Sequence, residues 1–275
     1  MSKSRLTSNA AAVVTGAGSG IGREFALDLA RRGGRVVCAD IKLEAAQETV
    51  DMIQALGAQA IAVACDVSKI SEVQALAVSA EDWLGTAVEV VINNAGVGAG
   101  GSVVGETPMK DWKWVLGVNL WGVIHGCHVF APLLRESGRG GIINVGSTAS
   151  FAAAPTMGPY NVSKAAVLAL TETLAAEMAG TDIRVTALCP TFVKTNIVRD
   201  GRIEGAGAGF AQKVMKWSGI PADGVARQTL NALDKGQLYV LPQLDARTIW
   251  RAKRLSPSLY ARGAGLLGRL MAARA

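Results

Sequence analysis

A tyrosine and a lysine stand four residues apart in the stretch GPYNVSKAAV, which begins at Gly158. On a helix, residues at this spacing lie on one face with Cβ atoms about 5–6 Å apart, so the polar tips of Tyr160 and Lys164 could share one small space. That arrangement permits a proton-transfer pair but does not require one, because tyrosines and lysines are also common on ordinary protein surfaces.

A glycine-rich turn, TGAGSGIGRE at residues 15–24, lies between an apolar run and a helical pattern. Gly16, Gly20 and Gly22 allow a tight turn and let backbone N–H groups approach a pyrophosphate at the positive end of the following helix. Such turns also occur without a ligand, but a strand before and a helix after are the context that dinucleotide binding needs.

The second apolar run, RVVCAD, ends on Asp40, about 20 residues beyond the turn. A carboxylate there would accept hydrogen bonds from the adenosine ribose hydroxyls and would repel a 2′-phosphate. Ser19 in the turn carries no positive charge, so NAD is favoured over NADP. Arg23 and Lys42 lie close enough in sequence to weaken that preference.

Short β-branched runs alternate with helical patterns along most of the chain. This alternation predicts an α/β fold with a single doubly wound parallel sheet (a Rossmann fold) of about seven strands, with helices on both faces. Runs such as AVVT and VVIN are apolar throughout, as expected when both faces of the sheet are covered. We expect strands at 11–15, 35–39, 60–65, 88–92, 141–145, 184–189 and 237–241, and helices at 22–32, 42–56, 71–84, 112–135, 158–178 and 222–235.

The composition is that of a soluble globule, with 275 residues of which half are hydrophobic and 18% are charged. No apolar run approaches the roughly 20 residues that span a bilayer, so we expect a cytoplasmic protein. The four cysteines are isolated in apolar segments, which indicates buried free thiols in a reducing compartment; they are Cys38, Cys65, Cys127 and Cys189.

Two classes of partner are disfavoured. His125 and His128 have a spacing that could bind a metal, but no third ligand joins them, and helix packing explains them better. The net charge of +6 lies entirely in the last 34 residues, which carry seven basic residues and one acidic residue. A neutral body with a basic tail argues against a broad nucleic-acid-binding face.

Taken together, these motifs resemble the short-chain dehydrogenase/reductase family in its T-G-x-x-x-G-x-G and Y-x-x-x-K form. The resemblance runs from about residue 9 to residue 241 and rests on motifs in the family's order. These are Thr15 to Gly22, Asp66 after the third strand, NNAG at 93–96, Asn119, Ser147, Tyr160 with Lys164, and PTFVKT at 190–195.

The resemblance implies catalytic roles for four of these residues. Tyr160 would be the general acid/base, with its pKa lowered by Lys164 and by the positively charged nicotinamide. Lys164 would also bind the nicotinamide ribose, and Ser147 would orient the reacting oxygen. Asn119 would hold a water that links Lys164 to solvent. Each has a plainer alternative: Ser147 could belong to an ordinary turn, and Asn119 could cap or bridge a helix.

The resemblance also implies the cofactor contacts. Asp66 would reach the adenine amine, although an aspartate there could equally be a helix cap, and Asn93 is expected to tie the central sheet together. Pro190 is followed by Thr191 where the family usually has glycine, which puts a side chain close to the nicotinamide. The full set is Gly16, Ser19, Gly20, Ile21, Gly22, Asp40, Asp66, Val67, Asn93, Ala95, Gly96, Tyr160, Lys164, Pro190, Val193 and Thr195.

We therefore divide the chain into an NAD-binding catalytic domain at 1–241, with a substrate loop at about 195–221, and a basic amphipathic extension at 242–275. The loop contains GAGAG, which suggests a hinge, and four apolar residues that could cap a substrate or pack as an ordinary helix: Phe210, Val214, Met215 and Trp217. With the apolar stretch SFAAAPTM opposite, these favour a lipophilic secondary alcohol or its ketone, interconverted by hydride transfer. A non-catalytic dinucleotide sensor is the alternative, but a sensor would be free to lose Tyr160, Lys164 or Ser147.

The extension mixes basic residues with Trp250, Leu255, Tyr260 and several leucines. It could contact an anionic membrane surface through residues 243–275, dock on a neighbouring subunit, cover the active site, or remain a solvated tail. By resemblance we expect a homodimer or homotetramer formed through the helices at 112–135 and 158–178.

Overall fold

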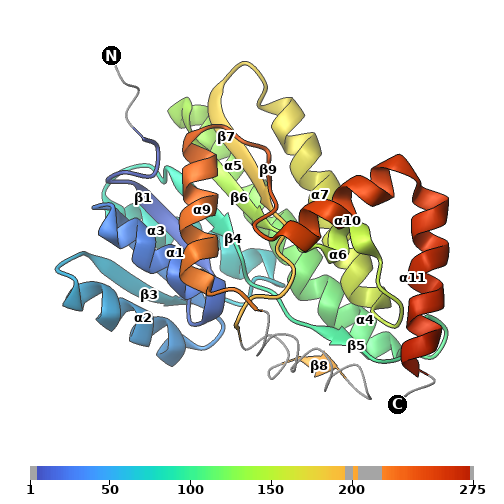
Figure 1. The fold of residues 1–275 in the computed structure, drawn as a ribbon. Coiled ribbons are helices and arrows are strands. Elements are labelled where there is room, and N and C mark those ends of the chain that lie inside the picture. Colours follow the sequence, from blue (N-terminus) through green and yellow to red (C-terminus); the bar gives the residue numbers. More distant parts are fainter. Residues whose placement is uncertain (1–4, 196–200, 204–218, 273–275) are drawn as a thin grey trace.

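A seven-stranded parallel sheet forms the centre of the computed structural model, which describes residues 5–195, 201–203 and 219–272 (Figure 1). The strand order is β3-β2-β1-β4-β6-β7-β9. The fold class and the seven strands predicted from the sequence are confirmed. The strands are β1 (Ala11–Thr15), β2 (Arg35–Asp40), β3 (Ala60–Ala64), β4 (Val90–Asn93), β6 (Arg139–Val145), β7 (Asp182–Leu188) and β9 (Tyr239–Val240).

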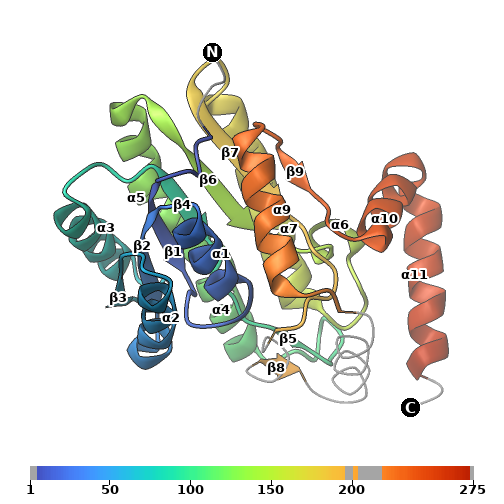
Figure 2. The same cartoon turned by 60° about the vertical axis from the view of Figure 1, so that its left-hand side comes forward.

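Helices cover both faces of this sheet (Figures 1 and 2). One face packs against α1 (Gly20–Arg31), α2 (Leu43–Ala55) and α9 (Ala222–Asp234). The other face packs against α3 (Ile70–Leu84), α5 (Gly122–Ser137) and α7 (Gly158–Glu177). Successive strand residues enter opposite cores, as Val13 and Val14 of β1 do. This alternation explains why the strands read as uninterrupted apolar runs.

The helix expected at 112–135 is longer and is interrupted. α4 (Met109–Leu116) continues through a π-helical stretch, η1 (Gly117–Trp121), into α5. Such stretches are frequent at functional sites, and this one carries Asn119. By length and mean hydropathy, Met109–Ser137 could cross a membrane. Its contacts with β4, β6 and α7, however, are those of a core helix of a folded domain.

Several short elements and the C-terminal helices complete the described chain. β5 (Ala99–Gly100) pairs with β8 (Arg202–Ile203), and a one-turn helix, α6 (Ala149–Ala152), follows β6. After β9, α10 (Leu244–Leu255) packs on α6, and α11 (Pro257–Ala272) packs on α10 at the edge of the molecule (Figure 2). The four cysteines are buried free thiols, as predicted.

Candidate active site

The predicted site residues gather at one edge of the sheet. Asp40 and Asn93 end β2 and β4, the glycine turn follows β1, and Ser147 lies two residues beyond β6. Because the strands are parallel, their carboxyl ends share this edge. β1 lies between β2 and β4. The connection after β1 and the connection after β3 therefore lead to strands on opposite sides of β1. That is the switch point at which open α/β sheets bind ligands.

The glycine turn after β1 is shaped so that side chains would block it. Gly16 and Gly20 have φ angles of +64° and +55°, the left-handed region that favours glycine. A Cβ on Gly22 would lie 2.1 Å from the carbonyl oxygen of Gly16. Ser19 is exposed and precedes α1 without a side-chain cap, so its hydroxyl leaves the first N–H groups of α1 free to bind a ligand. This cradle fits a diphosphate, with Ile21 packed partly against the core behind it.

Asp40 faces this turn from the end of β2. Its carboxylate accepts hydrogen bonds from the backbone N–H of Gly18 at 2.9 Å and of Lys42 at 3.0 Å. Arg23, which the sequence left as a possible partner for a 2′-phosphate, instead forms an ion pair with Glu48 at 2.9 Å. Its guanidinium also donates to Thr49 and to the Gly18 carbonyl. The turn therefore presents a carboxylate whose nearest arginine is already paired.

A link between β1 and β4 holds the turn in place, and sequence reasoning missed it. Asn94 donates through Nδ2 to the carbonyls of Thr15 at 2.9 Å and Gly16 at 3.1 Å. The Thr15 hydroxyl accepts from the N–H groups of Asn94 and Ala95. The second asparagine of NNAG was the available signal for this link. Ala95 thereby reaches the turn, and a Cβ on Gly16 would lie 2.8 Å from its Cα.

Asn93 ties the sheet together, as expected. Its Nδ2 donates to Oδ1 of Asn144 on the neighbouring strand β6 at 2.8 Å, and Asn144 donates in turn to Thr171 on α7 at 3.1 Å. Asn93 is only 3% exposed and a Cβ on Gly126 would lie 2.0 Å from its Oδ1. Asn93 is thus a buried structural residue beneath the site.

Asp66 and Val67 follow β3, close to the helix that carries Asn119. Asp66 accepts from the backbone N–H of Ser68 at 3.0 Å and from its hydroxyl at 2.7 Å, a local turn rather than a cap of α3, whose N-cap is Lys69. Burial raises the pKa of Asp66, but the hydrogen bonds from Ser68 and the nearby Lys69 bring it below its ordinary value. The Val67 carbonyl lies 2.9 Å from Nδ1 of His125, so that histidine is held in helix packing.

Tyr160, in the first turn of α7, and Ser147 meet at the centre of the edge. The Ser147 hydroxyl lies near the Tyr160 side chain, close enough to affect its pKa. Burial raises the pKa of Tyr160 above its ordinary value, and the Ser147 side chain lowers it in part. The Ser147 hydroxyl also accepts from the N–H of Ala149 at 3.1 Å and lies 3.5 Å from the Pro190 carbonyl.

Lys164 lies one turn further along α7 and is only 3% exposed. Its Nζ is 5.9 Å from the centre of the Tyr160 ring and donates to the Val145 carbonyl at 2.8 Å. Burial lowers the pKa of Lys164 to about 8. The two residues share a face of α7, and burial dominates the pKa of each in the free protein. The lowering of the Tyr160 pKa by Lys164 together with a bound nicotinamide stays a prediction.

Asn119 lies within the π-helical stretch and is completely buried. It binds the backbone of Val97 twice, accepting from the N–H at 2.7 Å and donating to the carbonyl at 2.9 Å. A Cβ on the exposed Gly96 would lie 3.3 Å from Asn119 Oδ1 and 3.5 Å from Lys164 Nζ. The structure therefore brings Asn119, Lys164 and Gly96 together, with Asn119 shaping the segment after β4.

The segment after β7 closes the site from the other side. The Pro190 carbonyl accepts from the N–H of Thr148 at 2.8 Å. Val193 is buried and pairs with Ile220 in an isolated bridge. A Cβ on Gly20 would lie 3.0 Å from Thr195 Cγ2, so Thr195 lies beside the glycine turn, and its contact with the cofactor stays a prediction. Phe210, Val214, Met215 and Trp217 lie outside the described residues.

Apolar side chains lie close to the start of α7, two residues before Tyr160. Beside Gly158, at the start of α7, lie Val104 and Trp112, and Val104 is 68% exposed. Ala153 and Thr156, within the apolar stretch after Ser147, have φ angles of +52° and +62°. Left-handed backbone is uncommon for residues other than glycine and often occurs at binding sites.

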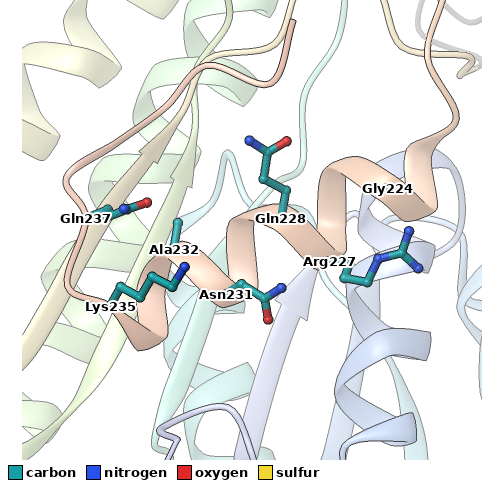
Figure 3. Close-up of a pocket in the computed structure, with 7 residues that line it drawn as sticks. All are labelled: Gly224, Arg227, Gln228, Asn231, Ala232, Lys235 and Gln237. Atoms are coloured by element: carbon teal, nitrogen blue, oxygen red, sulfur yellow. The ribbon is translucent and has the colours of Figure 1, made fainter.

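Two hollows along α9 contain none of the predicted site residues. One has a volume of about 340 Å³ and is lined by Gly224, Arg227, Gln228, Asn231, Ala232, Lys235 and Gln237 (Figure 3). Gln228 and Asn231, three residues apart on α9, both contribute to this lining. The second, of about 280 Å³, shares Gln228 and Ala232 and extends to Tyr239 and Arg247.

Comparison with known proteins identifies the family. A family model described as short chain dehydrogenase matches residues 10–204. The chain belongs to the short-chain dehydrogenase/reductases and is an oxidoreductase of that family. A solved short-chain dehydrogenase/reductase from Burkholderia phymatum in complex with NAD superposes with a TM-score of 0.84 at 39% identity, covering 90% of this chain and 94% of that one.

Two relatives have names that specify a reaction. The 1-deoxy-11-beta-hydroxypentalenate dehydrogenase of Streptomyces exfoliatus is 36% identical over 257 residues, covering 90% of both chains. The cyclohexanol dehydrogenase of an Acinetobacter species is 35% identical over 192 residues, covering 70% of this chain and 76% of that protein. Other curated relatives, oxidoreductases 42% identical over 188 residues, are much longer, and the chain spans 31% of their length.

Proposed function

We propose that this protein uses NAD(H) to interconvert a lipophilic secondary alcohol and its ketone, with Tyr160 as the general acid/base. The observation that carries the proposal is the gathering of Ser147, Tyr160 and Lys164 at the carboxyl edge of the sheet, with Lys164 Nζ 5.9 Å from the centre of the Tyr160 ring. NAD, when bound, takes up or supplies the hydride. Gly16, Gly20 and Gly22 would hold its diphosphate, and Asp40 its adenosine ribose.

The protein residues would manage the proton and the orientation of the substrate. Because burial raises the pKa of Tyr160, its phenol keeps its proton at neutral pH, the state that donates to a ketone oxygen. Ser147, near Tyr160, would position that oxygen. Lys164, whose pKa near 8 lies close to neutral pH, is suited to return a proton to the phenol by way of solvent.

The preference for NAD rests on Asp40 and the pairing of Arg23 with Glu48. Asp40 also supports the turn through Gly18, so two variants separate its charge from its hydrogen bond. Asp40→Asn removes the charge and can still accept from Gly18, whereas Asp40→Ala removes both. We expect both variants to lose discrimination against NADP, and only Asp40→Ala to raise the KM for NAD by tenfold or so. Unchanged discrimination in Asp40→Asn would refute the assignment.

A panel of secondary alcohols that includes cyclohexanol, assayed with NAD and with NADP through the absorbance of the reduced cofactor, tests the reaction. Tyr160→Phe should lower kcat by about 10²- to 10⁴-fold while NAD binding, followed by fluorescence, changes little. Full activity of Tyr160→Phe would refute the mechanism. If the wild-type protein binds NAD but turns over none of the panel, the dinucleotide-sensing alternative is favoured.

We also propose that α11 contacts an anionic membrane surface. Leu259 and Leu266 are 69% and 61% exposed on this helix, which carries Arg262 and Arg269 and no acidic residue. Because α10 packs on the body, the contact falls to α11 rather than to the whole of 243–275. Deletion of residues 257–275 should abolish co-sedimentation with vesicles that contain phosphatidylglycerol. Unchanged co-sedimentation would refute this contact.

A homodimer or homotetramer formed through α5 and α7 is a further proposal. Trp121, next to α5, and Val162 on α7 are 53% and 47% exposed, which would suit a subunit contact. Light scattering coupled to size-exclusion chromatography tests it. Trp121→Glu should convert the assembly to monomers, and a wild-type protein that elutes as a monomer would exclude it.

A further inference from the structure

Thr191, the residue that replaces the glycine of the family, is part of a chain of side-chain hydrogen bonds. Its hydroxyl lies 3.1 Å from the Thr148 hydroxyl and donates to Oδ1 of Asp245 at 3.0 Å. An ionised carboxylate only accepts, so the single proton of Thr191 is committed to Asp245. Thr148 must therefore be the donor to Thr191, and the chain runs in one direction, from Thr148 through Thr191 to Asp245.

This series of hydrogen bonds begins next to Ser147. Thr148 follows Ser147 directly, is only 5% exposed, and donates its N–H to the Pro190 carbonyl. That carbonyl also lies 3.5 Å from the Ser147 hydroxyl. The turns after β6 and β7 are thus joined by backbone bonds, and the hydroxyls of Thr148 and Thr191 join them a second time.

Asp245, the last residue in this series of hydrogen bonds, lies on α10, and α10 is itself packed against the body of the protein. Its Trp250 packs edge-to-face on Phe151 with ring centres 4.9 Å apart, and lies 5.1 Å from the Tyr239 ring. Tyr239 donates to Glu172 on α7, the helix that carries Tyr160, at 2.7 Å. Gln243, just before α10, accepts from the N–H of Thr191 at 3.1 Å. α10 therefore packs directly on the segment after Ser147, and it is linked to α7 through Tyr239 of β9.

We infer that Thr191 and Asp245 are positioning residues, through which the C-terminal helix α10 holds the Ser147–Thr148 turn in its working conformation. The inference rests on the proposed role of Ser147. It makes α10 a part of the catalytic domain in function, although α10 lies beyond the sheet in sequence. The substitution of threonine for glycine at 191 is then not a disturbance of the turn but the means by which the helix reaches it.

Amide hydrogen exchange on the free protein tests the positioning without any substrate. Thr191→Val keeps the shape of the side chain but leaves the buried Thr148 hydroxyl without its acceptor, whereas Thr191→Ser keeps the hydroxyl. We expect exchange in peptides covering 147–151 to rise about tenfold or more in Thr191→Val and Asp245→Ala. Thr191→Ser should stay close to the wild-type protein. Thr248→Val, which removes a hydroxyl bonded to Leu244 within α10, is the matched control.

Steady-state kinetics with NAD and cyclohexanol test the consequence. Thr191→Val should lower kcat by about tenfold with the KM for NAD unchanged. Thr191→Ser, which keeps the hydroxyl, should have a kcat close to that of the wild-type protein. If exchange at 147–151 and kcat are both unchanged in Thr191→Val, the inference is overturned. If exchange rises as expected but the wild-type protein turns over no alcohol, the positioning stands and the proposed reaction fails.

Discussion

Lys164 offers the sharpest test of the reasoning, because the residue that the proposed reaction needs is also one that burial makes costly. Folding lowers its pKa from 10.5 to about 8, which corresponds to about 3 kcal/mol of stability lost at neutral pH. Lys164→Met removes that cost but also the hydrogen bond to the Val145 carbonyl, a loss of about 1 kcal/mol. We expect a variant that is more stable than the wild-type protein by about 2 kcal/mol at pH 7 and has no activity.

The pH dependence of this gain has a definite sign. Below pH 8 the ammonium is charged in both states, so the full cost of burying it is present. Between pH 8 and 10.5 the unfolded chain holds the proton that the folded chain releases, so the wild-type protein recovers stability as the pH rises. The difference between Lys164→Met and the wild-type protein should therefore shrink over that range. Taking this difference also cancels the titration of the buried thiols of Cys38, Cys65 and Cys127, whereas Cys189, whose pKa burial raises and the nearby Lys164 lowers in part, contributes to the difference.

Urea unfolding at pH 7 and near pH 10 measures both quantities. Lys113→Met, which replaces an exposed lysine on α4, is the control and should change stability by less than about 0.5 kcal/mol. A Lys164→Met variant that is less stable than the wild-type protein at pH 7 would refute the argument. A stabilisation independent of pH would show that its source is not the buried charge.

Two glycine substitutions test the geometry of the site and its support. Gly22→Ala would place a Cβ 2.1 Å from the Gly16 carbonyl oxygen. We expect it to lower the free energy of unfolding by about 3 kcal/mol or more and to abolish NAD binding measured by calorimetry. The control is Gly224→Ala, on the open side of α9, whose free energy of unfolding should stay within about 1 kcal/mol of the wild-type value. Gly126→Ala would collide with Asn93 Oδ1 and should lower the unfolding free energy by about 2 kcal/mol in urea titrations; a neutral effect would show that the asparagine link is dispensable.

The sheet and the glycine turn could be predicted because their causes are local. An apolar run at every position marks a strand covered on both faces, and residues that lack a side chain mark a backbone that must pass close to something. The edge of the sheet at which Asp40, Asn93 and Ser147 meet then follows from the parallel strand order.

Other features depend on contacts that no local pattern contains. The Thr191 hydroxyl finds its partners at Thr148 and Asp245, each more than 40 residues away in sequence. The π-helical stretch around Asn119 has no marker in its composition. Burial raises the pKa of Tyr160 and lowers that of Lys164, which their spacing of four does not reveal.

The hydrogen bond between Asp40 and the N–H of Gly18 limits how this protein could change its preference between NAD and NADP. A Cβ on Gly18 would lie 2.8 Å from that carboxylate, so the two positions are fitted to each other. The simplest change that would allow a phosphorylated ribose to bind is to replace Asp40 with a small or basic residue. That change would also remove the hydrogen bond that holds the glycine turn, the proposed binding site of the diphosphate. A switch of coenzyme would therefore need paired changes at 18 and 40, and a small or basic residue at 40 alone should yield a poor user of either nucleotide.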